Sequence, residues 1–514
     1  MSEFSVGESS VDGFSVGRSS VDGFSVGDSS LDGFSGGGGD RGLHRLAAGT
    51  LLAAFPGTTA PEWILRELEE GLGGVTLFGF NVAGAEQLAA LTAQLRDAGD
   101  PVISLDEEGG DVTRLAYHVG SPYPGNAALG AVDDVELTRR VYRSIGDDLA
   151  RCGVNLDMAP DADVNTADDN PVIGTRSFGS DAALVARHTV AAVAGLQDAG
   201  VAACVKHFPG HGATRQDSHL EIPLVDVSRE VLWERELVPF RAAIEAGTKS
   251  IMTAHVRVPF LTGTAPATLS AAALTELLRG ELGYDGVVIS DALDMHAITE
   301  SVGLGGGAVL SLAAGSDLLC LGPLPTREQI GQVRAEIVAA VRDGRLPLAR
   351  LEEACERVAR LRGWFGSPRE EARDGNVIGL TAARRAVSLS GTATPLVNPF
   401  VIEVDTPPTI AVGDVPWGFA PWLPDAEIAR IKPDSADTTG LLERARGRSL
   451  VIVVKDAHRH RASQDIVSAL LAARPDATVI EMGLPIWRPS AAAYIATYGA
   501  ARANAQAAAE LLTA

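Results

Sequence analysis

VAACVKHF, residues 201–208, is a run of apolar residues that ends in Lys206, His207 and Phe208. Continuous apolar runs of this length are typical of strands that are buried on both faces of a parallel sheet. Seven more such runs lie along the chain, and amphipathic helical stretches such as 85–99 and 229–247 separate most of them. These runs are TLLAAF (50–55), GVTLFGF (74–80), PVISLD (101–106), GVNLDMAP (153–160), SIMTAHV (250–256), GVVISDA (286–292) and SDLLCLG (316–322). We therefore predict an α/β fold with a (β/α)8 TIM barrel over residues 41–365.

Most of the predicted strands end in polar or charged residues. The carboxyl ends of barrel strands meet at one mouth, where such enzymes place their chemistry. A doubly wound open sheet also gathers its strand ends, but its phosphate-binding glycine signature is missing, because GLGGG (303–307) follows no predicted strand. The barrel is therefore favoured. The polar strand-end residues are Asp106, Asp157, Asp161, Lys206, His207, His255 and Asp291.

Two other regions flank the predicted barrel. Residues 366–514 contain strand-like and helical runs, and we predict a smaller α/β domain there with a structural or binding role. Residues 1–40 repeat with a period of ten, and each repeat holds so few apolar residues that we predict a disordered tail. The C-terminal strand-like runs are VIEV (401–404), TIAVG (409–413), SLVIVVKD (449–456) and ATVIEMG (477–483), and the helical runs are 463–473 and 501–512.

Composition limits the classes of partner. The formal net charge is −23 and the pI is about 4.8, which disfavours nucleic acid and anionic membranes as partners. The first residues lack the positive flank and apolar core of a signal peptide, and no uninterrupted apolar run is long enough to span a bilayer. The four scattered cysteines indicate reduced thiols. We predict a cytoplasmic protein.

Three of the ten histidines lie in KHFPGHGATRQDSH, residues 206–219. The spacing of His207, His211 and His219 suggests metal ligands, but proline and glycine interrupt any helix and Lys206 would repel a cation. We therefore predict no metal. Asp217 lies two residues before His219, so on an extended backbone its carboxylate can orient the imidazole as an acid or base. A solvated surface pair is the alternative.

Asp291 directly follows the apolar run 286–290. A carboxylate at that position either caps the following helix or acts at the mouth of the barrel. Asp294, three residues further on, is expected to cap the helix or face solvent. His211 is expected to shape its turn, and His255 to line the pocket.

Four motifs occur in the order that a known family shows. They are LDEEGGDVTRL (105–115), NPVIGTRSFG (170–179), KHFPGHG with DSH four residues later (206–219), and SDALDM (290–295). Together they resemble glycoside hydrolase family 3, in its β-N-acetylglucosaminidase branch, along residues 45–365. The C-terminal region resembles the second domain of longer members.

The resemblance implies roles for eight residues. Asp291 is the implied nucleophile, His219 the general acid/base and Asp217 its orienting partner, and the implied sugar contacts are Asp106, Arg114, Arg176, Lys206 and His207. Structural alternatives remain for two of these, since Lys206 can pair with a neighbouring acid and Arg176 can fix its own loop. Many relatives carry Gln and Arg where this chain has Glu107 and Asp111, which we expect to add negative charge near the mouth.

The implied activity is that of a retaining β-N-acetylglucosaminidase that forms a covalent glycosyl-aspartate. Its implied substrates are small carbohydrates, β-linked N-acetylglucosaminides such as cell-wall muropeptide or chitin fragments, and no cofactor is implied. One alternative is a phosphorylase that uses phosphate as acceptor. Phosphate can approach an imidazole more easily than it can approach a second carboxylate, because like charges repel. Another is a non-catalytic protein that binds sugar or a partner.

Overall fold

The computed structural model describes residues 37–216, 222–365, 375 and 377–513. Residues 43–514 form one compact unit, which contains both sheets. Helix α1 (Gly37–Gly49) begins inside the predicted tail, so residues 37–40 are helical. Asp40 lies in its first turn, where the helix dipole favours negative charge. Residues 1–36, the rest of the predicted tail, lie outside the described residues.

Eight parallel strands form the first sheet, in the order β7-β6-β5-β4-β3-β2-β1-β8. A parallel bridge between Ile289 and Leu318 joins the two ends of this order and closes the barrel. Each strand falls within one of the eight predicted apolar runs. The strands are β1 (Leu51–Ala53), β2 (Gly74–Thr76), β3 (Val102–Leu105), β4 (Leu156–Asp157), β5 (Ala202–Phe208), β6 (Ser250–Thr253), β7 (Val287–Ile289) and β8 (Leu319–Cys320).

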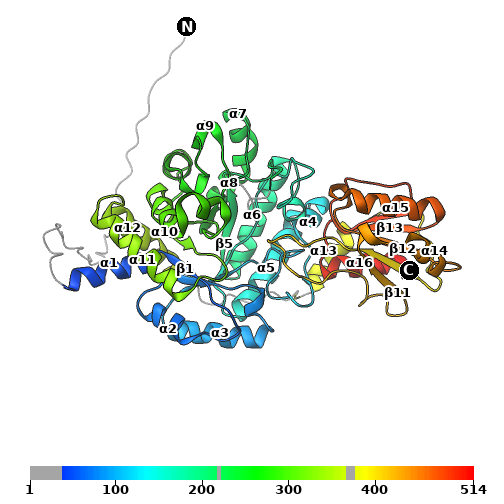
Figure 1. Ribbon diagram of the computed structural model, residues 1–514, viewed down its shortest axis with the longest axis horizontal. Coiled ribbons are helices and arrows are strands. Elements are labelled where there is room, and N and C mark those ends of the chain that lie inside the picture. The colour runs from blue at the N-terminus through cyan, green and yellow to red at the C-terminus, as the bar shows by residue number, and fades with distance from the viewer. Residues whose placement is uncertain (1–36, 217–221, 366–374, 376, 514) are drawn as a thin grey trace, which may run out of the picture. The chain divides into compact units, whose positions relative to one another are not determined.

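Helices surround these strands (Figure 1). Side chains accept backbone N–H groups at the first turns of several helices, as Asp134, Asp181 and Thr326 do at α5, α6 and α11. The glycine-rich stretch 303–307 lies within α10 and does not directly follow a strand, as the sequence indicated. The helices are α2 (Glu62–Glu69), α3 (Ala85–Asp97), α4 (Asn126–Val132), α5 (Val135–Arg151), α6 (Ala182–Asp198), α7 (Arg229–Val231), α8 (Leu237–Glu245), α9 (Pro259–Thr262), α10 (His296–Ala314), α11 (Arg327–Arg342) and α12 (Leu348–Trp364).

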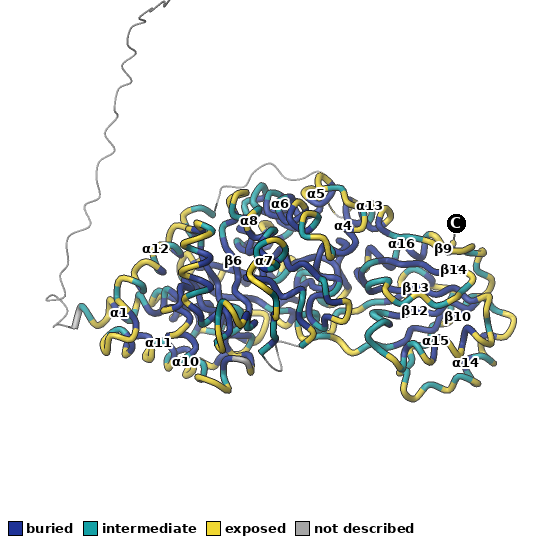
Figure 2. Tube along the Cα trace, turned by 90° about the horizontal axis from the view of Figure 1, so that it is seen from above, coloured by how far each residue is buried: buried dark blue, intermediate teal, exposed yellow. Residues whose placement is uncertain are grey.

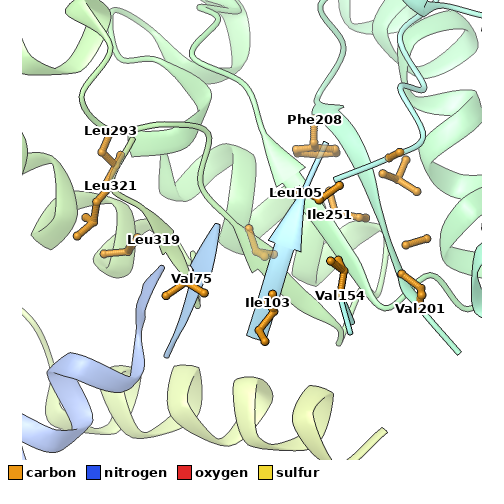
Figure 3. Close-up of a cluster of buried hydrophobic side chains, with 14 of the residues drawn as sticks. Val75, Ile103, Leu105, Val154, Val201, Phe208, Ile251, Leu293, Leu319 and Leu321 are labelled. Atoms are coloured by element: carbon orange, nitrogen blue, oxygen red, sulfur yellow. The ribbon is translucent and has the colours of Figure 1, made fainter. Parts of the chain in front are cut away.

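Side chains of the barrel strands divide between two hydrophobic clusters. Figure 3 shows part of the outer cluster, which includes Val75, Ile103 and Ile251 and packs against the helices. The inner cluster includes alternate strand residues such as Leu52 together with Leu361 of α12. This alternation follows from the two-residue period of a strand. Helix α12 therefore closes the inner cluster with apolar residues, and the polar strand ends remain for the mouth.

The second sheet has the order β11-β10-β12-β13-β14-β9, and β9 is its antiparallel edge strand. Helices α14 (Thr438–Arg444) and α15 (Arg461–Ala473) contribute to the cluster on one face, and α16 (Arg502–Thr513) contributes to the cluster on the other. Figure 2 shows its central strands as buried. The predicted α/β domain is confirmed, with β9 (Ser388–Gly391), β10 (Phe400–Val404), β11 (Glu427–Ile431), β12 (Leu450–Val454), β13 (Thr478–Glu481), β14 (Ala493–Ala496) and a further helix α13 (Val377–Ala386).

One predicted C-terminal strand is wrong. Residues 409–413, TIAVG, form a turn that is closed by a hydrogen bond from Gly413 N–H to the Thr409 carbonyl oxygen. Two prolines precede the turn, and Gly413 has a φ of 71°, in the left-handed region. The apolar residues of the turn are therefore not buried in a sheet, and Ile410 is 66% exposed.

Among the described helices, none combines the length and the apolar character that crossing a membrane requires.

Candidate active site

A cavity of about 390 Å³ is lined by the carboxyl ends of the barrel strands and the loops that follow them. Cavities of this size suit small-molecule ligands. Six of the eight sequence-predicted site residues line it: Asp106, Arg114, Arg176, Lys206, His207 and Asp291. The other two, Asp217 and His219, lie outside the described residues, which omit 217–221. The fold thus brings together side chains that are up to 185 positions apart in the chain, since 291 − 106 = 185.

Lys206 is the centre of a buried ion-pair cluster. Its Nζ lies 2.7 Å from both Asp106 Oδ1 and Glu108 Oε1, and its side chain is 2% exposed. Burial raises the pKa of Asp106, but Lys206 and Arg114 outweigh it, and the net pKa lies below the usual range. The same balance lowers the pKa of Glu108, where Arg176 and Lys206 overcome burial. Both acids are therefore carboxylates near neutral pH, and the Lys206 ammonium is fixed between them.

Arg176 has the structural role considered for it, and its contact to a sugar stays a prediction. Its guanidinium makes a bidentate pair with Glu108, with Nε 3.0 Å from Oε2 and Nη2 2.8 Å from Oε1. Its Nη1 also donates to the Val172 carbonyl oxygen at 3.1 Å, which ties down its own loop. Sequence reasoning missed Glu108 as a site residue. Its place two residues after Asp106, with the same side-chain direction, was the available signal.

His207 is held by a second carboxylate that sequence reasoning missed. Its Nδ1 lies 2.8 Å from Asp163 Oδ2, and Asp163 Oδ1 accepts the His211 backbone N–H at 2.6 Å. Burial, followed by the charge of Arg176, lowers the pKa of His207 to about 4, so its ring is neutral near pH 7. Burial raises the pKa of Asp163 to about 6. An ionised Asp163 accepts the Nδ1 proton, which leaves Nε2 as an acceptor beside Arg176 Nη2, 3.4 Å away.

Asp161, Asp163 and His207 place three possible metal-ligand atoms within 4.8 Å of one another. Two of these residues, Asp163 and His207, already share a hydrogen bond. Arg176 Nη2 lies 3.8 Å from Asp161 Oδ2, so the guanidinium supplies positive charge to the same carboxylates. The geometry is that of a hydrogen-bonded ion-pair cluster, and the absence of a metal from the reaction stays a prediction.

Asp291 lies two residues beyond the end of β7 and lines the cavity. Its backbone N–H donates to Thr253 Oγ1 at 3.3 Å, and its Oδ1 accepts the Ala292 N–H at 2.8 Å. The residue is half-buried, so the carboxyl group can meet a ligand in the cavity. Asp294 is exposed, as expected, although it also borders the cavity.

The other two histidines of interest differ in exposure to the cavity. His211 lines it, and its Nδ1 lies 2.7 Å from Thr214 Oγ1, which shapes the turn as predicted. His255 was expected to line the pocket, but it is not among the lining residues. It is fully buried, and its Nε2 bonds to the Ala292 carbonyl oxygen at 2.9 Å, so it supports the backbone beside Asp291 from behind.

Arg114 connects the cavity to the C-terminal domain. Its Nη2 donates to the Ala411 carbonyl oxygen at 2.8 Å and its Nη1 to that of Val412 at 3.3 Å. Nη2 also lies 3.6 Å from Asp106 Oδ2. The predicted sugar contact of Arg114 stays a prediction, but its position is set by both domains.

The expectation that Glu107 and Asp111 add negative charge at the mouth is wrong. Glu107 is 1% exposed, and it accepts the backbone N–H groups of Arg114 and Leu115 at 2.8 and 2.9 Å. Burial raises its pKa to about 7. Asp111 is buried against the C-terminal domain, where it accepts the Ala500 N–H at 2.8 Å. Neither side chain lines the cavity, because both satisfy buried donors instead.

Comparisons with known proteins agree with this geometry. A model of the "Glycosyl hydrolase family 3 N terminal domain" matches residues 54–361. Beta-hexosaminidase A of Pseudoalteromonas piscicida is 34% identical over 319 residues, which cover 57% of this chain and 53% of that protein. Beta-hexosaminidase LpqI of Mycobacterium tuberculosis is 37% identical over 284 residues, covering 53% of this chain and 71% of that protein. The chain thus spans about half the length of the first of these relatives.

A solved structure extends the likeness to the C-terminal domain. It is a glycoside hydrolase family 3 β-N-acetylglucosaminidase from Paenibacillus sp. strain FPU-7, with 33% identity and a TM-score of 0.82. The match covers 92% of this chain and 96% of that one. With the family model matched over more than half of its length, the chain belongs to glycosyl hydrolase family 3.

Proposed function

We propose that this chain is a retaining β-N-acetylglucosaminidase. The observation that carries the proposal is the position of Asp291 beside a cavity that also holds the ion-paired Asp106, Lys206 and Arg176. The names of the relatives support this choice, since they are called β-hexosaminidases and a β-N-acetylglucosaminidase. In this proposal residues 41–365 carry the chemistry, and residues 366–514 form a second domain that completes the mouth.

The charged cluster is suited to hold one sugar ring. Asp106 and the Nε2 atom of His207 accept hydrogen bonds from hydroxyl groups, and Lys206 and Arg176 donate them. Each of these side chains is already fixed by an ion pair or a hydrogen bond. Such preorganised groups cost little reorganisation when positive charge develops at the anomeric carbon.

The proposed reaction has two steps. In the first, an Asp291 carboxylate oxygen bonds to the anomeric carbon while the bond to the leaving oxygen breaks, and His219 gives its proton to that oxygen. In the second, His219 takes a proton from water, whose oxygen attacks the anomeric carbon and releases Asp291. Asp217 stabilises the imidazolium. Two inversions retain the β configuration.

Small cell-wall muropeptide or chitin fragments are the proposed natural substrates, and the cytoplasmic location stays a prediction. The test is release of 4-nitrophenol from its β-N-acetylglucosaminide by the wild type, Asp291→Asn and His219→Ala. Asp198→Asn is the matched control, since Asp198 pairs with Arg139 at the surface. We expect a loss of at least about 10³-fold in kcat for Asp291→Asn, and about 10²–10⁴-fold for His219→Ala, because this variant lacks the general base of the second step.

Three other results would overturn parts of the proposal. Full activity of Asp291→Asn would remove this residue as the nucleophile. Release of a sugar 1-phosphate in the presence of phosphate would assign the chain to phosphorolysis instead. No turnover of any β-N-acetylglucosaminide by the wild type would support the non-catalytic sugar-binding alternative.

A further inference from the structure

Asp168 and Asp169 are consecutive residues that are bound from two different domains. His458 of the C-terminal domain places its Nε2 atom 2.8 Å from the Asp168 carbonyl oxygen. Arg215 of the barrel donates from Nη1 to Asp169 Oδ2 at 2.9 Å. Because a carbonyl oxygen only accepts hydrogen bonds, the Nε2 atom of His458 carries the proton and is the donor. The loop that contains these two aspartates therefore links the C-terminal domain to the barrel.

The same loop is bound to residues 211–215 of the barrel by further hydrogen bonds. The Ala167 N–H donates to the Gly212 carbonyl oxygen at 3.2 Å. Asn170 is 1% exposed, and its Nδ2 donates to the His211 carbonyl oxygen at 3.0 Å. The Oδ1 atom of Asn170 accepts two backbone N–H groups of its own loop at 2.9 Å, so the orientation of the amide is fixed. A displacement of this loop is therefore passed on to residues 211–215.

The turn that carries His458 is itself held to the second sheet. It lies between β12 and α15 as the short helix η8 (Ala457–Arg459). Glu481, at the end of β13, accepts two backbone N–H groups at the start of the turn, at 2.8 and 3.2 Å. Gln464 of α15 donates from Nε2 to the His458 carbonyl oxygen at 3.2 Å. Among the described residues, the imidazole bonds only to the Asp168 carbonyl oxygen, because its buried Nδ1 has no partner.

Residues 211–215 lie between the cavity and the residues proposed for acid–base catalysis. At one end of this segment, the His211 backbone N–H donates to Asp163 at 2.6 Å, and the His211 ring lines the cavity. Beyond the other end, Asp217 and His219 follow closely in the sequence. The backbone at 211–215 therefore sets the point from which the chain continues to the acid/base pair.

We propose that His458 is a positioning residue for the general acid/base His219. Its hydrogen bond fixes the Asp168 backbone, and the bonds of that loop fix residues 211–215, from which the chain continues to His219. This inference rests on the proposed function, and it adds that the C-terminal domain acts on the proton-transfer step. His458 does not line the cavity, so it acts through these backbones. The effect is measurable, because a misplacement of about 1 Å in a catalytic group can lower a rate about 10²-fold.

The experiment uses two aryl substrates that share the sugar. They are 4-nitrophenyl and phenyl β-N-acetylglucosaminide, and they differ in the acidity of the phenol that leaves. Phenol is the weaker acid, so its departure depends more on a proton from the enzyme. The value of kcat/KM compares the free enzyme and substrate with the transition state of the first step, in which the leaving oxygen receives its proton. The ratio of the two kcat/KM values therefore reports proton donation, whereas a change in the fold or in sugar binding lowers both values alike.

Three variants separate the hydrogen bond of His458 from the packing of its ring. His458→Leu and His458→Ala both lack the donor but differ in volume, whereas His458→Gln keeps an amide N–H that can donate in place of Nε2. His460→Ala is the matched control, since His460 is half-buried like His458 and, among the described residues, forms no hydrogen bond to the barrel. His219→Ala is the reference for a complete loss of proton donation. Thermal melts of all proteins check that the fold is unchanged.

We expect His458→Leu and His458→Ala to lower kcat/KM for the phenyl substrate about threefold to tenfold. The value for the 4-nitrophenyl substrate stays within about twofold, as do both values for His458→Gln and His460→Ala. Equal losses on both substrates would overturn the inference, because His458 would then act on the fold or on sugar binding. Unchanged values in the two variants without the donor would overturn it as well, and so would a loss in His458→Gln as large as that in His458→Leu.

Two outcomes separate this inference from the function on which it rests. If His219→Ala changes the ratio of the two kcat/KM values and the His458 variants do not, the acid/base role of His219 stands and the role of His458 is rejected. If the wild type turns over neither substrate, the proposed function is rejected, and the role of His458 with it.

Discussion

Replacing Asp163 by asparagine tests how far the neutral His207 depends on its buried partner. The substitution keeps the shape of the side chain and one oxygen, which can still accept the His211 backbone N–H, now 2.6 Å away. It replaces the oxygen that faces His207 Nδ1 at 2.8 Å by an amide group that donates. His207 must then carry its proton on Nε2, which turns a donor toward Arg176 Nη2 at 3.4 Å.

The expected cost follows from the bond that is lost. A hydrogen bond to a charged group contributes about 1.5–3 kcal/mol. If the whole of this free energy orients His207 toward the sugar in the transition state, its loss corresponds to about a 10- to 150-fold fall in kcat/KM. The fold should remain intact, because the backbone contact of Asp163 survives.

The pH profile gives a second readout that a merely structural role would not change. Burial raises the pKa of Asp163 to about 6, so the carboxylate takes up a proton as the pH falls through this value. In the wild type, kcat/KM for the 4-nitrophenyl substrate should fall below about pH 6 for this reason. Asparagine does not titrate, so the difference in kcat/KM between Asp163→Asn and the wild type should become smaller toward low pH.

The control is Asp198→Asn, which removes a carboxylate from a surface ion pair with Arg139. Surface pairs contribute little, so its activity and pH profile should match those of the wild type. If Asp163→Asn stays within about twofold of the wild type at pH 7, the reasoning about the His207 tautomer is refuted.

Three further predictions concern stability. Burial raises the pKa of Glu481 from 4.5 to about 8, so the stability that its protonated form contributes is present below pH 4.5 and is lost as the pH rises to 8. Between about pH 5 and 8, the free energy of unfolding in urea should therefore fall about 4 kcal/mol less in Glu481→Gln than in the wild type. Parallel plots of this free energy against pH for the two proteins would contradict the prediction. Asp111→Ala removes a hydrogen bond from the Ala500 N–H and an ion pair with Lys455, both in the C-terminal domain. It should lower the free energy of unfolding by about 2–4 kcal/mol and speed proteolysis near residue 500; an unchanged proteolysis rate would argue against it. Gly212→Ala brings a Cβ against the Val164 carbonyl oxygen and should lower the Tm. Gly331→Ala, with open space around the new Cβ, should leave the Tm unchanged. Equal melting curves for the two variants would contradict the prediction and show that the loop at Gly212 shifts to accommodate the methyl group.

Some of the fold and site could be predicted because local sequence carries the signal. The apolar runs of β1 to β8 are buried on both faces, so their continuous character identifies them without tertiary information. Polar residues at the ends of these runs had to meet at one mouth once the barrel was inferred. Strand β11, EIARI, was missed because its residues are mostly half-exposed at a sheet edge, where the apolar pattern is weak.

The sequence by itself determined the barrel, the second α/β domain and the motifs that identify the family, because burial imposes periodic apolar patterns and each motif is a contiguous stretch. Only the tertiary structure decided the partners of each charge. Glu108 and Asp163 bond to the cavity residues Arg176 and His207. Glu107 and Asp111 instead accept buried backbone N–H groups, although all four are acids near the same cavity. It also turned TIAVG from a predicted strand into part of the cavity wall. The physical reason is that a carboxylate's role depends on which donors lie within about 3 Å of it, and distant segments supply those donors.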